Sequence, residues 1–330
     1  MNWTRIFDNS LSAAIRPNAI IFAISAIGLN VHFGYTGLLN FGQVGFLAIG
    51  GYGAAISVLQ WNFPLWLGWL FGLFCAMCWA LLLGYPTLRL RADYLAIVTI
   101  AAGEIFRLSV MAPSFREVTG GSDGLSGFNN DWRSLNPLPD GEYGIGFLKF
   151  SAAETWSILV GWTLVLLSVL LVYLLIRSPW GRVLKAIRED EDAVRALGKN
   201  VFAYKMQSLV LGGCLGALAG IYFVTQQASV VPSNYSTAQT FFAYVCLILG
   251  GTARIWGPVI GSMIFWAIIT FTDNFLRQAI DAGYISGSLL DPNQVGQVRL
   301  MLVGLGLILL LVFRPQGILG DRRELMLEAR

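Results

Sequence analysis

The sequence predicts an all-α fold, a polytopic bundle of about eight to ten transmembrane helices in one domain over residues 1–330. Of the 330 residues, 56% are hydrophobic and 12% are charged, and the mean hydropathy is +0.65. No Asp, Glu, Lys or Arg occurs between Arg16 and Arg89 or between Lys205 and Arg254. Each interval is longer than the roughly 20 apolar residues that cross one bilayer. These observations exclude a soluble enzyme.

The apolar stretches are continuous and rich in Leu, Ile, Ala and Gly, as spanning helices are, and do not alternate every second residue as a closed barrel would. The candidate spans are 17–37, 38–59, 64–84, 94–111, 155–176, 206–226, 237–253, 255–272 and 298–313.

The stretch from Gly34 to Gly53 contains seven glycines, together with Asn40 and Gln43. Glycine destabilises a helix by up to about 1 kcal/mol relative to alanine, so we expect a broken or re-entrant helix here. Irregular backbone at membrane depth survives only where protein or water satisfies it. Close packing through small residues explains the glycines equally well, and the sequence leaves both readings open.

Two other glycine patterns concern packing and symmetry. Gly212, Gly216 and Gly220 recur every fourth residue, which predicts one smooth helix face for close contact. Further glycines surround Pro258 and predict a second interrupted apolar region. With the first, this region suggests a degenerate two-half repeat, which in transporters points toward the pathway.

Charged segments predict orientation, because short cytoplasmic loops are enriched in Lys and Arg. The basic segments 86–93, 177–205 and 314–330 are expected to be cytoplasmic, the C-terminus included. The more acidic segment 112–154 is expected to be an external loop. Arg5 and Arg16 favour a cytoplasmic N-terminus, which conflicts with the number of spans that follow.

The basic segment 177–205 predicts an exposed helix. Ser178 can cap its first turn, Pro179 suits its first position and Gly198 suits its end. Three oppositely charged pairs lie four residues apart and support this helix. They are Lys185 with Glu189, Arg188 with Asp192, and Glu191 with Arg195. An amphipathic segment that rests on lipid headgroups or on the bundle is the alternative.

Other polar groups give little sign of catalysis or metal binding. All four cysteines lie in apolar runs, and His32 is the chain's one histidine, so we expect neither a disulfide nor a metal site. Glu104 and Arg107 lie three apart inside a predicted span. They are either a clamp between helices or groups that face a pathway, and we expect a clamp with partial exposure to the pathway.

Several motifs carry a family resemblance. They are AIREDEDAVRALG at 186–198, GYTGLLNFGQ at 34–43, LRLRADYLAIVT at 88–99, GEIFR at 103–107, TGGSDGL at 119–125 and RPQGILG at 314–320. Together they resemble the M-type permease subunits of bacterial branched-chain amino-acid (Leu/Ile/Val) ABC importers. The resemblance covers most of the chain.

The resemblance implies a multi-pass subunit of the bacterial inner membrane, paired with a second related permease, two cytoplasmic ATPases and an external solute-binding protein. No phosphate-binding Gly-x-x-x-x-Gly-Lys-[Ser/Thr] loop occurs, so ATP and Mg²⁺ are expected on the ATPases, with no cofactor on this chain. The resemblance further implies that one rigid helix from Arg182 to Leu197 sits in a cleft of an ATPase. The residues expected to couple to the ATPases are Arg182, Ile187, Glu189, Asp190, Glu191 and Gly198. Those expected along the solute pathway are Gly37, Asn40, Gln43, Glu104 and Arg107.

The predicted function is therefore import of branched-chain or other neutral hydrophobic amino acids, driven by ATP that partner chains hydrolyse. Uptake of urea or short amides, or ion-coupled secondary transport, are the alternatives. A membrane enzyme is disfavoured because no nucleophile and base set is present. Nothing indicates a nucleic-acid partner.

Overall fold

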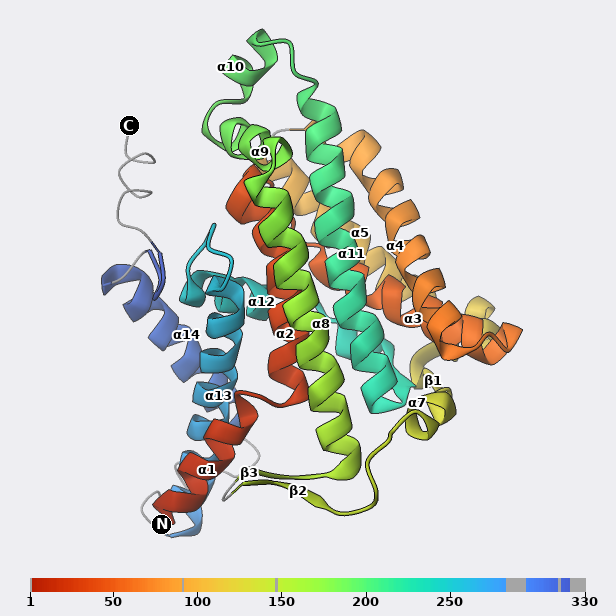
Figure 1. Cartoon of the computed structure of the whole chain (residues 1–330), viewed down its shortest axis with the longest axis vertical. Helices are drawn as coiled ribbons and strands as arrows, with labels where there is room; N and C mark the ends of the chain where they lie inside the picture. The colour runs from red at the N-terminus through yellow and green to blue at the C-terminus, as the bar shows by residue number, and fades with distance from the viewer. Residues whose placement is uncertain (1, 91, 146–147, 283–294, 314–315, 321–330) are drawn as a thin grey trace.

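The computed structural model describes residues 2–90, 92–145, 148–282, 295–313 and 316–320. Helices form most of this part of the chain (Figure 1). The long helices are α2 (Pro17–Leu29), α3 (Gln43–Trp61), α4 (Leu65–Thr87), α5 (Ala92–Met111), α8 (Ala152–Arg177), α11 (Val201–Gln227), α12 (Thr237–Gly250), α13 (Gly257–Asp281) and α14 (Val295–Phe313). The short ones are α1 (Trp3–Ala13), α6 (Arg116–Thr119), α7 (Asn130–Ser134), α9 (Pro179–Glu189) and α10 (Glu191–Ala196).

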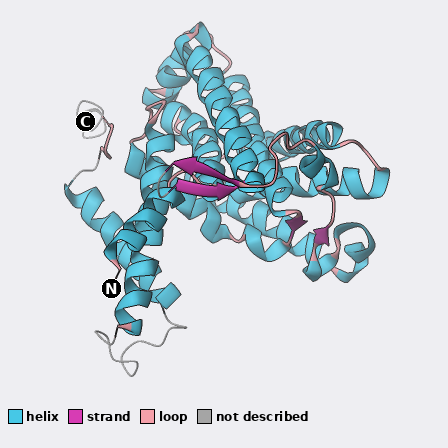
Figure 2. Cartoon of the chain, turned by 60° about the horizontal axis from the view of Figure 1, so that its bottom comes forward, coloured by secondary structure: helices cyan, strands magenta, loops and turns pink. Residues whose placement is uncertain are grey.

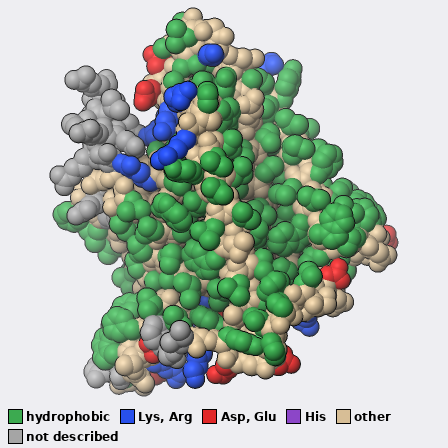
Figure 3. Space-filling model, in the orientation of Figure 1, with side chains coloured by type: hydrophobic (Ala, Val, Ile, Leu, Met, Phe, Trp, Pro, Cys, Tyr) green, Lys and Arg blue, Asp and Glu red, His purple; other side chains and the backbone are tan. Residues whose placement is uncertain are grey.

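The predicted fold class is confirmed. Among the described residues, seven helices are long and apolar enough to cross a membrane, and two shorter apolar helices accompany them. Every predicted span coincides with a helix, because continuous apolarity of this length is stable only as helix in a bilayer. On the molecular surface, hydrophobic side chains cover the middle of the bundle and charged ones gather toward its ends (Figure 3).

The strands are short and form two separate pairs at one end of the bundle (Figure 2). β2 (Glu142–Ile145) and β3 (Leu148–Ser151) form an antiparallel hairpin before α8. β1 (Leu125–Ser126) pairs antiparallel with β4 (Ser229–Val230), which follows α11. We call this end of the bundle the hairpin end.

The opposite end, which we call the α9–α10 end, gathers the segments predicted to be cytoplasmic. The Arg89 guanidinium, in the link between α4 and α5, lies 5.8 Å from the ring centroid of Phe202 at the start of α11. The N–H of Ile318 donates to the carbonyl of Leu249 at 3.0 Å, which fixes the described C-terminal residues beside α12. Segment 112–154 lies at the hairpin end. Arg91 and the basic residues of the C-terminal tail lie outside the described residues.

The N-terminal segment does not share an end with the other basic segments. α1 packs on α13, and Arg16 lies at the hairpin end, where its Nε is 3.1 Å from Oε1 of Glu154 at the start of α8. Arg16 and the other described basic segments therefore lie at opposite ends of the bundle. A nearby carboxylate holds the charge of Arg16 there, which a count of basic residues does not register.

The expected break in the glycine-rich stretch is present but shorter than predicted. α2 continues as a π-helical turn, Asn30–Tyr35, irregular chain follows over 36–42, and α3 then runs unbroken from Gln43. The later glycines are contact sites instead: a Cβ on Gly50 would lie 2.6 Å from the carbonyl oxygen of Ala217 in α11. A break and close packing thus both occur, each in a different part of the stretch, and a pathway role for the glycines stays a prediction.

α2, α3 and α11 form the centre of the bundle, and α2 is the most deeply buried of the candidate spans. The predicted smooth face of α11 is confirmed, since a Cβ on Gly220 would lie 2.0 Å from the carbonyl oxygen of Leu47 in α3. The second predicted interruption is the turn 251–256 between α12 and α13. It begins at Gly251, whose φ of +110° requires glycine.

Candidate functional site

Helix α9 rests on the π-helical turn of α2. Its Leu184 is fully buried and packs in the central core with Val31 and Tyr35 of that turn. The ammonium of Lys185 lies 5.8 Å from the Tyr35 ring centroid. One face of the predicted coupling segment is therefore fixed to the bundle, and does not rest on lipid.

The rigid helix predicted from Arg182 to Leu197 is wrong, because the segment breaks at Asp190. This residue has an extended backbone (φ −154°, ψ 103°) and its Oδ1 accepts a hydrogen bond of 2.9 Å from the N–H of Ala193. An aspartate is more stable as the N-cap of a new helix than inside one. α9 and α10 are consequently two rigid pieces joined by one extended residue.

Two acidic residues of α10 form ion pairs. The predicted pair of Glu191 with Arg195 is confirmed at 2.9 Å, and Asp192 also contacts Arg195, at 2.7 Å. Glu191 additionally contacts Lys205 of α11. Such pairs between partly exposed side chains contribute little stability each, but the second one of Glu191 holds α10 against α11.

The other predicted coupling residues differ in accessibility. Arg182, Glu189 and Asp190 are exposed. Ile187 is 4% exposed and packs with Val194 and Val201, so its contacts are internal to the chain.

The end of α10 is open to a partner. Gly198 has a φ of +75°, the left-handed conformation that commonly ends helices. Beside it, Leu197 is 79% exposed. α10 thus ends in an uncovered apolar side chain surrounded by charges.

The irregular segment 36–42 re-enters the bundle from the α9–α10 end. Hydrogen bonds turn the chain back on the π-helical turn: the N–H of Leu38 donates to the carbonyl of His32 at 2.8 Å. The Thr36 hydroxyl donates to the carbonyl of Val31 at 2.8 Å and lies 2.7 Å from the hydroxyl of Ser208 in α11. We refer to residues 36–42 as the re-entrant segment.

A buried polar network fixes the end of the re-entrant segment. Asn40 is 1% exposed and Gln43 is fully buried. The Asn40 amide donates to Nδ1 of His32 at 3.1 Å and to Oε1 of Gln43 at 3.2 Å, and Gln43 donates to the carbonyl of Gly212 at 3.1 Å. Because Nε2 of His32 lies 3.2 Å from the carbonyl of Leu209, which can only accept, His32 is the neutral Nε2–H tautomer.

The start of α3 needs hydrogen-bond acceptors from elsewhere, because the first N–H groups of a helix have no acceptor within the helix. Side chains of two neighbouring helices bond to backbone N–H groups here, one just before α3 and one in its first turn. Thr99 of α5 accepts from the N–H of Phe41 at 3.1 Å, and Thr240 of α12 accepts from the N–H of Val44 at 3.0 Å. The re-entrant segment is therefore held by α5, α11 and α12 together.

Glu104 and Arg107 form an ion pair within α5, with two hydrogen bonds of 3.0 and 2.5 Å. Their side chains are 36% and 21% exposed. They border a stripe of exposed apolar residues on the same helix, which consists of Tyr94, Ile97, Ile105 and Leu108. The pair therefore differs from Asn40 and Gln43 in being accessible from outside this chain.

Gly37 lies beside α9: a Cβ on it would be 3.4 Å from Cγ of Arg188. Arg188 itself donates from Nη1 to the carbonyl oxygen of Gly34 at 2.6 Å. On the far side of the π-helical turn, Asn30 bonds to the backbone of the turn 251–256. The sequence prediction missed Asn30 entirely and gave Arg188 only a surface ion pair. A polar residue within an apolar span is the one sequence signal that marks Asn30.

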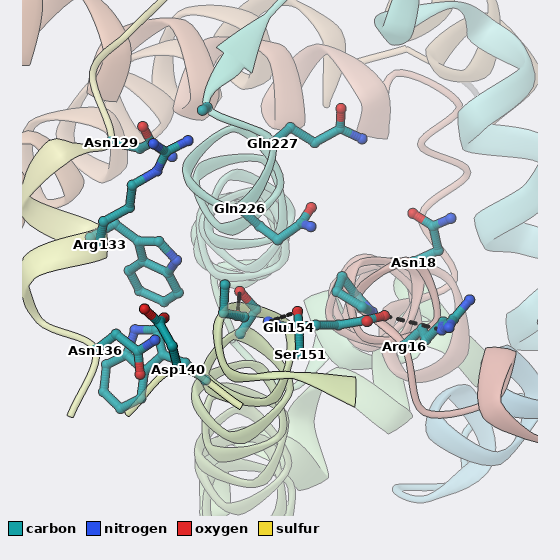
Figure 4. A pocket seen from close by; sticks show the side chains of 16 residues that line it. Arg16, Asn18, Asn129, Arg133, Asn136, Asp140, Ser151, Glu154, Gln226 and Gln227 are labelled. Atoms are coloured by element: carbon teal, nitrogen blue, oxygen red, sulfur yellow. Dashed lines mark hydrogen bonds and ion pairs between the residues drawn. The ribbon is translucent and has the colours of Figure 1, made fainter. Parts of the chain in front are cut away.

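A polar cavity of about 740 Å³ opens at the hairpin end between α2, α8, α11 and the α7 region (Figure 4). Arg16 and Glu154 lie on one side of it, and Arg133 and Asp140 on the other. Trp132 and Trp156 form part of its wall, with ring centroids 5.8 Å apart. The cavity combines both charges with amide groups and opens to the outside of the bundle at this end.

The fold and these sites define a polytopic membrane permease with an exposed helical segment for a partner at one end. Residues 14–312 match the model of the family described as branched-chain amino acid transport system / permease component. The chain belongs to this family and is a permease subunit of a branched-chain amino-acid ABC importer.

The individual relatives of this chain include permease proteins of branched-chain amino-acid transport systems. The high-affinity branched-chain amino acid transport system permease protein LivM of Salmonella typhimurium is 31% identical, over 94% of this chain and 71% of its own length. LivM of Escherichia coli K12 is 30% identical over 92% and 69%. A LivM protein of Methanocaldococcus jannaschii is 25% identical over 92% and 91%.

Proposed function

We propose that this chain couples ATP hydrolysis on separate cytoplasmic subunits to amino-acid import, with α9 and α10 as the segment that the ATPases bind. The exposed end of α10 carries the proposal. Leu197 is 79% exposed and lies between the charged groups of α10 and the terminating Gly198, so a protein cleft can bury it while the charges fix its orientation.

The proposed orientation puts the α9–α10 end in the cytoplasm, with the C-terminal residues. The clustering of the described basic segments at this end supports it. The polar cavity at the hairpin end is then external, where a solute-binding protein delivers the solute. ATP and Mg²⁺ belong to the ATPases, and this chain supplies neither.

A second permease subunit is proposed to cover the exposed face of α5. A half-exposed ion pair such as Glu104 with Arg107 is costly against lipid tails, whereas a partner chain or a water-filled pathway accommodates it. We therefore place these two residues along the pathway, where they meet the carboxylate and ammonium of the solute. We propose an indirect role for Asn40, Gln43 and Gly37, which hold the re-entrant segment in place and do not contact the solute.

The experiment uses the complex of this chain with the second permease, the two ATPases and the solute-binding protein in proteoliposomes, with uptake of labelled leucine measured with and without ATP. Unlabelled branched-chain amino acids, urea and acetamide serve as competitors. ATP-dependent leucine uptake that branched-chain amino acids suppress, and urea and acetamide do not, supports the proposal. Uptake driven by an ion gradient without ATP contradicts it.

Leu197→Asp tests the docking segment directly. A charge buried in an apolar cleft is strongly unfavourable, so we expect recovery of the ATPases with the permease to fall by about tenfold or more. Leu135→Asp is the matched control, because Leu135 is 60% exposed at the hairpin end and the same change should leave ATPase recovery unaltered. Equal recovery with both variants would remove α10 from the interface.

A further inference from the structure

The π-helical turn Asn30–Tyr35 is held from two opposite sides at one residue, Gly34. On one side its carbonyl oxygen accepts a hydrogen bond of 2.6 Å from Arg188 of α9. On the other side a Cβ on Gly34 would lie 2.0 Å from Oδ1 of Asn30 and 2.8 Å from the N–H nitrogen of Ala253. Gly34 is therefore confined between α9 and the turn 251–256.

Asn30 connects this turn to the link between α12 and α13. It is 1% exposed, and both ends of its amide are engaged. Its Nδ2 donates to the carbonyl of Arg254 at 2.8 Å, and its Oδ1 accepts from the N–H of Ala253 at 2.9 Å. Ala253 has a φ of +56°, a strained conformation for a residue with a Cβ, which persists only where the surroundings enforce it.

The same π-helical turn carries the re-entrant segment, through the bonds of Leu38 to His32 and of Thr36 to Val31. A π-helical turn is rare and commonly marks a functional position in a helix. Here it joins three elements that are far apart in sequence: α9, the re-entrant segment and the turn 251–256.

We infer that Arg188 and Asn30 are positioning residues of the transport cycle, which join α9, the π-helical turn with its re-entrant segment, and the turn 251–256 into one moving unit. The inference rests on the proposed function, in which the ATPases displace α9. The Arg188 bond is charge-assisted and the Asn30 amide is buried with both ends satisfied, so neither contact is easily exchanged for water during a displacement.

The main test compares Arg188→Gln with the matched control Arg177→Gln. Arg177 lies 4.2 Å from the Tyr173 ring at the end of α8 and belongs to another contact. In the reconstituted complex, Arg188→Gln should retain ATP hydrolysis while leucine uptake per ATP falls by about tenfold, since a hydrogen bond from a charged donor is lost. Arg177→Gln should keep the wild-type ratio. Arg188→Lys should recover part of the loss, because an ammonium can still donate to the Gly34 carbonyl.

Asn30→Ala tests the same unit from the opposite side. If both residues act through the π-helical turn, Asn30→Ala also lowers uptake per ATP, and the double variant is no worse than the more severe single one. Effects that multiply in the double variant would show independent sites and overturn the inference. A ratio unchanged in both single variants would overturn it as well.

A second measurement leaves Arg188 and Asn30 intact and applies even where their variants fail to assemble. Spin labels are placed at exposed positions 179 of α9 and 256 of the turn 251–256, and the distance between them is measured in the nucleotide-free and ATP-bound complex. One moving unit predicts the same distance in both states, while labels at 179 and 61, on opposite ends, report the overall change. A distance from 179 to 256 that changes as much as the control distance overturns the inference. Failure of the proposed function has a different result, since the wild-type complex would then show no ATP-dependent uptake at all.

Discussion

Two polar clusters inside the membrane domain differ in their burial and in the groups to which they bond. Around the re-entrant segment, Asn40, Gln43 and His32 are buried and bond to one another and to the backbone of α11. On α5, Glu104 and Arg107 bond to each other and remain partly exposed. The first cluster supports irregular backbone inside this chain, whereas the second offers charge to something outside it. The role of a polar residue at membrane depth can therefore be interpreted only together with the exposed fraction of its side chain.

The largest effect on stability is expected from the buried cluster. Asn40→Leu removes the bonds to His32 and Gln43 and the one that Oδ1 accepts from the N–H of Gly42. Because it leaves these buried groups unpaired, it should lower the free energy of unfolding by about 3 kcal/mol. Thermal unfolding in detergent measures this. Asn18→Leu, the same change at an exposed position of α2, should have little effect, and equal destabilisation by the two would contradict the distinction.

Substitutions of the ion pair on α5 should affect uptake strongly and stability only slightly. Glu104→Gln and Arg107→Gln should each lower leucine uptake by about tenfold, because one partner for the zwitterionic solute is lost, while stability changes by less than about 1 kcal/mol. Proteoliposome uptake and unfolding are measured on the same preparations.

Exchanging the two charges, Glu104→Arg with Arg107→Glu, sharpens this result. If the pair only clamps α5, the exchanged pair still forms and uptake stays normal. If the pair binds the zwitterionic solute in one orientation, the exchange lowers uptake. Normal uptake with reduced stability in the single variants would remove the pathway role.

The smallest effect is expected at His32. Both ring nitrogens are engaged, so His32→Gln should lower the free energy of unfolding by about 1 kcal/mol. The shape of the uptake profile between about pH 6 and 8 should not change, because the ring is not free to exchange protons there. Uptake measured across that interval checks this, and a variant that loses a pH-dependent step would show that His32 carries protons.

Local signals in the sequence predicted most of the helices, since spanning segments must be continuously apolar. The break near Gly34 was also predicted, but its extent was not. Glycine density is the same whether a glycine terminates a helix, as around residues 36–42, or contacts another backbone, as Gly50 contacts Ala217. The second use depends on a helix far away in sequence, which no local pattern contains.

The candidate site was predicted less completely for the same reason. The resemblance marked segment 186–198, but the break at Asp190 depends on competition between capping and continuing a helix. The bond from Arg188 to Gly34 spans 154 residues of sequence, and surface spacing suggested an ion pair instead. Likewise, Arg16 is held at the hairpin end by a carboxylate of α8, which its own neighbours in sequence do not reveal.

The extended residue at Asp190 has a mechanical consequence. α9 is docked on the bundle, whereas α10 is held against α11 by the contact of Glu191 with Lys205 and ends in the uncovered Leu197. A force applied at Leu197 would therefore reach the bundle at two separate places, through α9 and through α11. An uninterrupted helix would transmit the same force along a single axis.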